Sequence, residues 1–71
     1  MESTQHKIAQ AASLVLANSS VRDLRKIRVD RSDNQIELSG TVRSFYHKQL
    51  AQETIRTVAG GMQVVNRVDV G

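Results

Sequence analysis

The chain has 71 residues and no cysteine, and its 10 Lys and Arg residues outnumber its 7 Asp and Glu residues, for a formal net charge of +3. This length allows one small domain, and the absence of cysteine excludes a disulfide framework and a thiolate metal site. No apolar run approaches the roughly 20 residues of a membrane-spanning helix. The basic balance favours anionic partners such as phospholipid headgroups, nucleic acid or acidic protein.

The first predicted element is a helix over residues 4–18, with Ser3 or Thr4 as its cap. Leu14 projects among the polar residues of this helix, either as a lone exposed leucine or as a contact for a partner. One apolar stripe is predicted along this helix, because apolar residues recur there at the 3.6-residue helical spacing: Ile8, Ala12, Val15 and Leu16.

A hairpin follows, with strands predicted over residues 26–31 and 35–42 because apolar and polar residues alternate there. The turn is Ser32-Asp33-Asn34, since Asp and Asn tolerate left-handed backbone and form Asx-type bonds. In the second strand Gly40 shares the inward face, where it either permits close packing of a helix or marks a bulge.

A second helix is predicted over residues 45–58, with Ser44 as its cap. Gly60-Gly61 ends the helix region, and a third strand is predicted over residues 62–70. Asn66 falls on the inward face of that strand and needs hydrogen-bond partners, which we expect among backbone groups near Gly40 or at the helix ends.

The element order predicts an α/β (α+β) fold. It is a single domain over residues 1–71, arranged helix-strand-strand-helix-strand, with two helices packed on one face of a three-stranded mixed sheet. The order of the strands stays open. The opposite sheet face is expected to be polar and mixed in charge, with Lys26, Arg28, Asp30, Gln35, Glu37, Arg67 and Asp69. The predicted core is Ile8, Val15, Leu16, Ile27, Val29, Ile36, Leu38, Val42, Leu50, Ile55, Val58, Val64, Val68 and Val70.

No enzyme, cofactor or metal site is predicted. The two histidines, His6 and His47, are each followed by a lysine rather than an acid. Neither a Ser/His/Asp spacing, a phosphate-cradling glycine loop nor a His/carboxylate ligand set is present. We expect His47 to be a half-buried packing residue.

The candidate site is the start of the second helix: Arg43, Ser44, Phe45, Tyr46 and Lys48. Acids are usual at a helix N-terminus, and a cationic start favours an anion instead. Helical spacing points both aromatic rings away from the apolar stripe, which suits a membrane interface with rings at headgroup depth and cations on phosphates. Two alternatives stay open: a ring folds back over the hairpin end or the first helix, or the rings form a protein contact.

The chain resembles the BON domain, named for bacterial OsmY and nodulation proteins. The resemblance covers nearly the whole chain and includes Ile27-x-Val29, Ile36-x-Leu38-Ser39-Gly40-Thr41-Val42, Ser44, Lys48 with Ala51, Val58-x-Gly60, and Val65-Asn66-Arg67-Val68-Asp69-Val70. Gly61 departs from the family, which usually has an aliphatic residue there. The resemblance implies a non-enzymatic α/β module of bacterial envelope proteins that binds phospholipid or supports envelope integrity and the stress response.

We therefore expect a binding module that attaches peripherally to anionic phospholipid membrane or envelope surfaces. The alternative is a protein–protein interaction or oligomerisation module within a larger bacterial envelope protein, using a free sheet edge or Leu14 with the aromatic pair. Nucleic acid is not expected as a partner, because the chain has no Gly-x-x-Gly clamp and no aromatic on the open sheet face. The location stays open: we expect the periplasm or cell envelope if the chain is a fragment, and the cytoplasm if it is complete.

Overall fold

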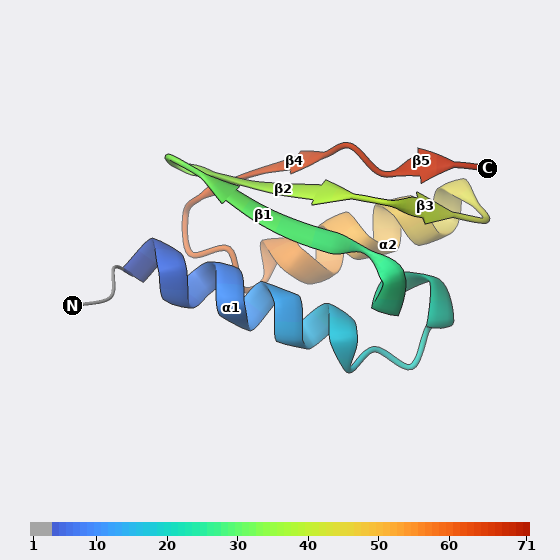
Figure 1. The fold of residues 1–71 in the computed structure, drawn as a ribbon, viewed down its shortest axis with the longest axis horizontal. Helices are drawn as coiled ribbons and strands as arrows, with labels where there is room; N and C mark the ends of the chain where they lie inside the picture. The colour runs from blue at the N-terminus through green and yellow to red at the C-terminus, as the bar shows by residue number, and fades with distance from the viewer. Residues whose placement is uncertain (1–3) are drawn as a thin grey trace.

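A computed structural model describes residues 4–71, with side chains from residue 7 onward, so the predicted cap at Ser3 or Thr4 and the His6 side chain lie outside the description. The chain forms helices on one side of a sheet (Figure 1). The elements are α1 (Thr4–Ala17), the 3₁₀ helix η1 (Arg22–Lys26), β1 (Arg28–Ser32), β2 (Gln35–Ser39), β3 (Thr41–Val42), α2 (Phe45–Arg56), β4 (Gln63–Asn66) and β5 (Asp69–Val70).

The predicted fold class is confirmed: a three-stranded mixed sheet carries both α-helices on one face (Figure 1). The strand order, which the sequence left open, is β1-β2-β4. The central strand β2 pairs antiparallel with β1 and parallel with β4. Its two inward side chains, Ile36 and Leu38, are fully buried.

The parallel pairing runs on past the end of β2 in one unbroken register. Gln35 pairs with Gln63 and Thr41 pairs with Asp69, so each residue meets the one 28 positions later in both segments. The predicted strand over residues 35–42 is therefore interrupted without a change of register, which excludes a bulge at Gly40. There the backbone φ is +128°, and an added Cβ would lie 3.4 Å from the carbonyl oxygen of Lys26. Gly40 thus permits a close approach to the end of η1.

The 3₁₀ helix η1 is an element that the sequence analysis missed, and it corrects the start of the first strand. Residues 26 and 27 precede β1, so Lys26 does not lie on the open sheet face as predicted. The helix is held by two buried side chains of opposite character, Asp23 at 4% and Leu24 at 2% exposure. Leu24 enters the core, and Asp23 finds its partners outside η1.

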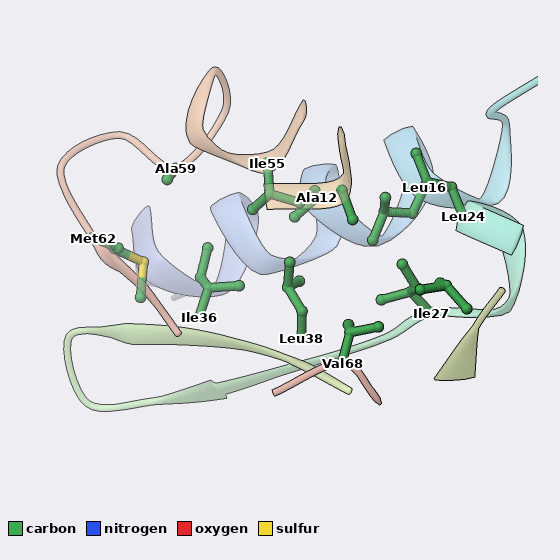
Figure 2. Close-up of a cluster of buried hydrophobic side chains, with 12 residues drawn as sticks. Ala12, Leu16, Leu24, Ile27, Ile36, Leu38, Ile55, Ala59, Met62 and Val68 are labelled. Carbon is green, nitrogen blue, oxygen red and sulfur yellow. The ribbon is translucent and has the colours of Figure 1, made fainter. Parts of the chain in front are cut away.

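The core lies between the sheet and the two α-helices (Figure 2). Two predicted core residues are exposed instead: Val15 at 36% and Val70 at 46%. Val70 ends an edge strand that pairs on one side only, and Val15 lies on a helix whose fully covered positions are Ala12 and Leu16. The buried apolar residues are Ala12, Leu16, Leu24, Ile27, Ile36, Leu38, Val42, Ala51, Ile55, Ala59, Met62 and Val68.

Asn66 fastens the edge strand β4 to α2. Its Nδ2 donates to the carbonyl oxygen of Lys48 at 2.9 Å and to Oε1 of Gln52 at 3.2 Å. Its Oδ1 accepts the backbone N–H of Val68 at 3.1 Å. The side chain is therefore satisfied by α2 and by the backbone between β4 and β5. Of the two expected sources, the helix end supplies a partner at Lys48, and no bond from Asn66 to the backbone near Gly40 is seen within the described residues.

The open face of the sheet carries paired charges. Arg67 Nε lies 2.8 Å from Glu37 Oε1, and Arg28 Nε lies 3.4 Å from Asp30 Oδ2. Asp30 and Glu37 occupy opposed positions on β1 and β2, where two carboxylates would repel each other. The arginines offset that repulsion, and this face presents ion pairs rather than a cationic platform.

Candidate functional site

The start of α2 is organised by Ser44, one of the predicted site residues. Ser44 has an extended backbone, and its side chain accepts the backbone N–H of His47 at 3.2 Å. The Ser44 carbonyl accepts the N–H of Lys48 at 3.3 Å. This is the usual serine cap, which satisfies helix N–H groups that have no partner inside the helix. Ser44 thus fixes where the first turn begins.

The two aromatic rings of the chain stand in solvent at this first turn. Phe45 is 63% exposed and Tyr46 is 68% exposed, so neither ring covers the hairpin end or α1. Tyr46 lies beside the ring of His47, with 5.7 Å between the ring centroids and 52° between the planes. Exposed rings of this size are uncommon at positions that serve only the fold.

A buried carboxylate from η1 holds the segment that leads into α2. Asp23 Oδ2 accepts the backbone N–H of Arg43 at 2.7 Å, and Oδ1 accepts Nε of the same residue at 3.3 Å. His47 Nδ1 lies 3.2 Å from Asp23 Oδ2. These three contacts join η1 to both sides of the Ser44 cap.

The surroundings of Asp23 favour its ionised form. The backbone N–H of Arg43 is the main cause that lowers the pKa of Asp23, and the Arg43 side chain and His47 add to it, while burial acts in the opposite direction. A carboxylate that accepts several hydrogen bonds is stabilised in this way. The helix start therefore has an acid after all, supplied from 20 residues earlier in the chain.

His47 is half-buried, as predicted, and its partner Asp23 is the functional-site residue that sequence reasoning missed. The side chain of His47 is 28% exposed. Asp23 is separated from it by 24 residues, and only the fold of η1 against α2 brings them together. The one sequence signal is an acid held between Val21 and Leu24, two apolar residues that both pack on the core.

The remaining predicted residues, Arg43 and Lys48, lie on either side of the rings. The Arg43 side chain is 71% exposed although its Nε contacts Asp23. Lys48 is half-buried, and its carbonyl accepts an N–H of the Asn66 side chain. No acid lies in the first turn of α2. The start of α2 thus has two exposed rings, an exposed arginine and a half-buried lysine around a serine cap.

Three features are not found among the described residues: a metal-ligand cluster, a pocket and a membrane-spanning helix. Within residues 7–71, no three His, Asp or Glu side chains gather as they would around a metal ion. No pocket opens in the described part of the chain. None of the described helices is both long enough and apolar enough to span a bilayer.

Comparison with known proteins tests the resemblance found in the sequence. No sequence among the curated proteins matches the chain significantly. The BON domain family matches residues 4–71, which are also the residues that the structure describes. BON domains are binding domains rather than a catalytic family, and they are associated with membrane phospholipid. The chain belongs to the BON domain family.

Proposed function

We propose that this domain binds anionic phospholipid surfaces peripherally, through the first turn of α2. The observation that carries the proposal is the exposure of Phe45 and Tyr46, at 63% and 68%, between the cations Arg43 and Lys48. Aromatic rings favour the headgroup depth of a bilayer, and each Lys or Arg near an anionic surface contributes about 1 kcal/mol.

The placement of Asp23 supports the proposal. A carboxylate next to a lipid-binding surface would normally repel anionic headgroups. Asp23 is only 4% exposed, and its carboxylate accepts the backbone and side-chain N–H groups of Arg43, so it is not presented at the surface. The guanidinium of Arg43 stays largely in solvent and remains accessible to a phosphate.

The other broad surface of the molecule suits an anionic partner less well. On the open sheet face, Arg28 and Arg67 are already paired with carboxylates. The chain has one Phe, one Tyr and no Trp, and both aromatics lie on α2, so no ring is available on the sheet for stacking with single-stranded RNA.

A vesicle experiment tests the proposal directly. Sedimentation with phosphatidylglycerol vesicles should carry the domain down at low salt, with less bound at high salt and little bound to phosphatidylcholine. The double variant Phe45→Ser/Tyr46→Ser should lose this binding while its circular dichroism stays that of a folded domain. Wild-type sedimentation by this variant would contradict the proposal.

A matched variant reports the location of the contact. The chain has no tryptophan, so Tyr46→Trp introduces a single fluorophore that keeps an aromatic ring at the site. Its emission should shift to shorter wavelength with anionic vesicles, whereas Ser32→Trp in the distant hairpin should not respond. If light scattering instead shows mass rising with concentration, and vesicles leave Tyr46→Trp unchanged, the domain is an interaction module and not a lipid-binding one.

A further inference from the structure

Three of the five exposed large hydrophobic side chains among the described residues lie at one end of the molecule. They belong to the first turn of α2 and to β5: Phe45, Tyr46 and Val70. Figure 1 places these two segments at the end where η1 and the C-terminus lie, whereas the last turns of α1, with Leu14 and Val15, lie further back along the opposite edge. The hairpin of β1 and β2 and the connection from α2 to β4 lie at the opposite end. We call the first end, which also includes η1 and β3, the basic end.

Among the described residues, the cations of η1 form no ion pair. No salt bridge there involves Arg22, Arg25 or Lys26, and all three are exposed. Arg25 donates to the backbone carbonyl of Ser19, at 3.0 Å. Elsewhere in the fold, three arginines are paired with acids: Arg28, Arg56 and Arg67.

The net charge of the described chain is accordingly concentrated. With Arg43 and Lys48, the basic end carries five cations. Against these stand two acids, the buried Asp23 and Asp69 of β5. The rest of residues 7–71 has five cations and four acids. Apolar exposure and unpaired positive charge thus coincide on the same surface.

We propose that the domain docks end-on to an anionic bilayer, with Arg22, Arg25 and Lys26 of η1 as a second set of phosphate contacts beside the α2 turn. This inference rests on the proposed function and adds to it the orientation and the residues of η1. The molecule measures 38 × 20 × 16 Å, and the basic end closes its long axis (Figure 1). Among the described residues, both exposed rings, Val70 and the unpaired cations of η1 lie at this end, so an end-on pose brings them to the headgroups together.

Asp23 connects the η1 cations to the first turn of α2. It lies in η1 between Arg22 and Arg25, and it binds both Arg43 and His47 around the α2 cap. The positions of the η1 cations relative to Phe45 and Tyr46 are therefore fixed by a buried connection before any lipid is met. Contacts that are held in place in advance lose less conformational entropy on binding.

Charge-matched variants test the role of η1. The triple variant Arg22→Gln/Arg25→Gln/Lys26→Gln and the control Lys7→Gln/Arg31→Gln/Arg56→Gln each remove three positive charges. Each cation near the surface contributes about fivefold, so the η1 variant should bind phosphatidylglycerol vesicles on the order of 100-fold more weakly. The control should lose no more than about tenfold. Equal losses in the two variants would overturn the role of η1.

Site-specific labels test the orientation. Because the chain has no cysteine, Ser20→Cys beside η1 and Ser32→Cys in the hairpin each accept one environment-sensitive fluorophore. Anionic vesicles should raise and blue-shift the signal at residue 20 and leave that at residue 32 unchanged. A response at both positions would indicate a side-on pose and would overturn the inference.

These outcomes separate the inference from the proposed function. If Phe45→Ser/Tyr46→Ser abolishes binding while the two charge variants behave alike, the α2 site stands and the η1 contribution is wrong. If the wild-type domain binds neither phosphatidylglycerol nor any other anionic vesicle, both fail.

Discussion

Asp23 accepts the backbone N–H of Arg43 across 2.7 Å, and through this bond the short helix η1 fixes the turn from which α2 begins. The bond is the shortest of three that the buried carboxylate makes, and the other two engage the side chains of Arg43 and His47. A single acid thus links three parts of the chain that the sequence separates by up to 24 residues.

Removing this charge should destabilise the domain. Asp23→Asn keeps the size of the side chain but loses the charge-assisted bonds to Arg43, so its thermal midpoint should fall clearly below that of the wild type. Asp33→Asn is the matched control, because Asp33 is exposed in the hairpin turn at φ +48°, a conformation that Asn tolerates as well as Asp. Equal midpoints for the two variants in a circular dichroism melt would contradict the role of Asp23.

The lowered pKa of Asp23 predicts an acid-sensitive contribution to stability. Its pKa is lower in the folded state than in the unfolded state, where it should be near the ordinary value of about 3.9. The contribution is therefore complete above pH about 4 and is lost as the pH falls through the folded-state pKa. In urea unfolding, the difference in the free energy of unfolding between wild type and Asp23→Asn should be larger at pH 5 than at pH 2. A gap that widens on acidification would mean that the carboxylate is not stabilised in the folded state.

The aromatic pair should be dispensable for folding. Phe45 and Tyr46 are exposed, so replacing either by serine should change the free energy of unfolding by no more than about 0.5 kcal/mol. Leu38→Ala is the contrast, since Leu38 is fully buried and its truncation should cost about 2–5 kcal/mol. Chemical denaturation measures all three. A large loss at Phe45 or Tyr46 would show that the rings serve the core.

Alanine substitutions at Gly40 and Gly61 should differ in their cost to stability, because the two glycines differ in backbone conformation. Both have positive φ, at +128° and +91°, and alanine is strained at either. An added methyl at Gly40 also meets the carbonyl of Lys26 at 3.4 Å, whereas at Gly61 it meets nothing within 4 Å. The φ of Gly40 lies farther from the left-handed helical value of about +57° than the φ of Gly61 does, so Gly40→Ala should cost about 1–3 kcal/mol and more than Gly61→Ala. The reverse order in urea unfolding would refute this difference in backbone strain.

Asn66 should stabilise the edge strand through its three bonds. Asn66→Ala leaves the carbonyl of Lys48 and the N–H of Val68 without this partner, and we expect a loss of about 1–3 kcal/mol. Asn66→Asp keeps an oxygen that can accept the backbone N–H of Val68. It also replaces the Nδ2 donor with a carboxylate oxygen, which then faces the carbonyl oxygen of Lys48. In hydrogen exchange, the Val68 amide should be less protected in the alanine variant than in the wild type. Unchanged protection would show that Oδ1 does not hold this amide.

The fold was predictable from the sequence because its main signals are local and periodic. Alternation around Ile36 and Leu38 predicted the strand that contains β2, though not its central position, and Ser44 marked the start of α2 correctly. The errors occurred where periodicity is short or one-sided. The helix η1 has only five residues, which are too few to show a periodic pattern. The sequence therefore predicts a connection around Asp23 and Leu24 rather than a helix. Val70 fits the pattern of a buried face, but it lies at the end of an edge strand.

The candidate site was predictable only in part, for the same reason. Residues 43–48 are contiguous, and helical spacing alone turned Phe45 and Tyr46 outward, as the structure has them. The partners that complete this surface come from η1, which lies about 20 residues earlier. Long-range contacts of a single acid leave no periodic pattern in one sequence, and Asp23 could be recognised only once the helix was seen against α2.

The bond between Asn66 and the Val68 amide also bears on how copies of this domain coexist. A bare strand edge offers a row of unsatisfied donors and acceptors to any extended chain, and so invites aggregation. Along residues 63–71 the outward amide of Val68, near the middle of that row, is already engaged by the Asn66 side chain. A neighbouring copy that approached sideways would meet a broken row, which protects crowded domains from joining edge to edge.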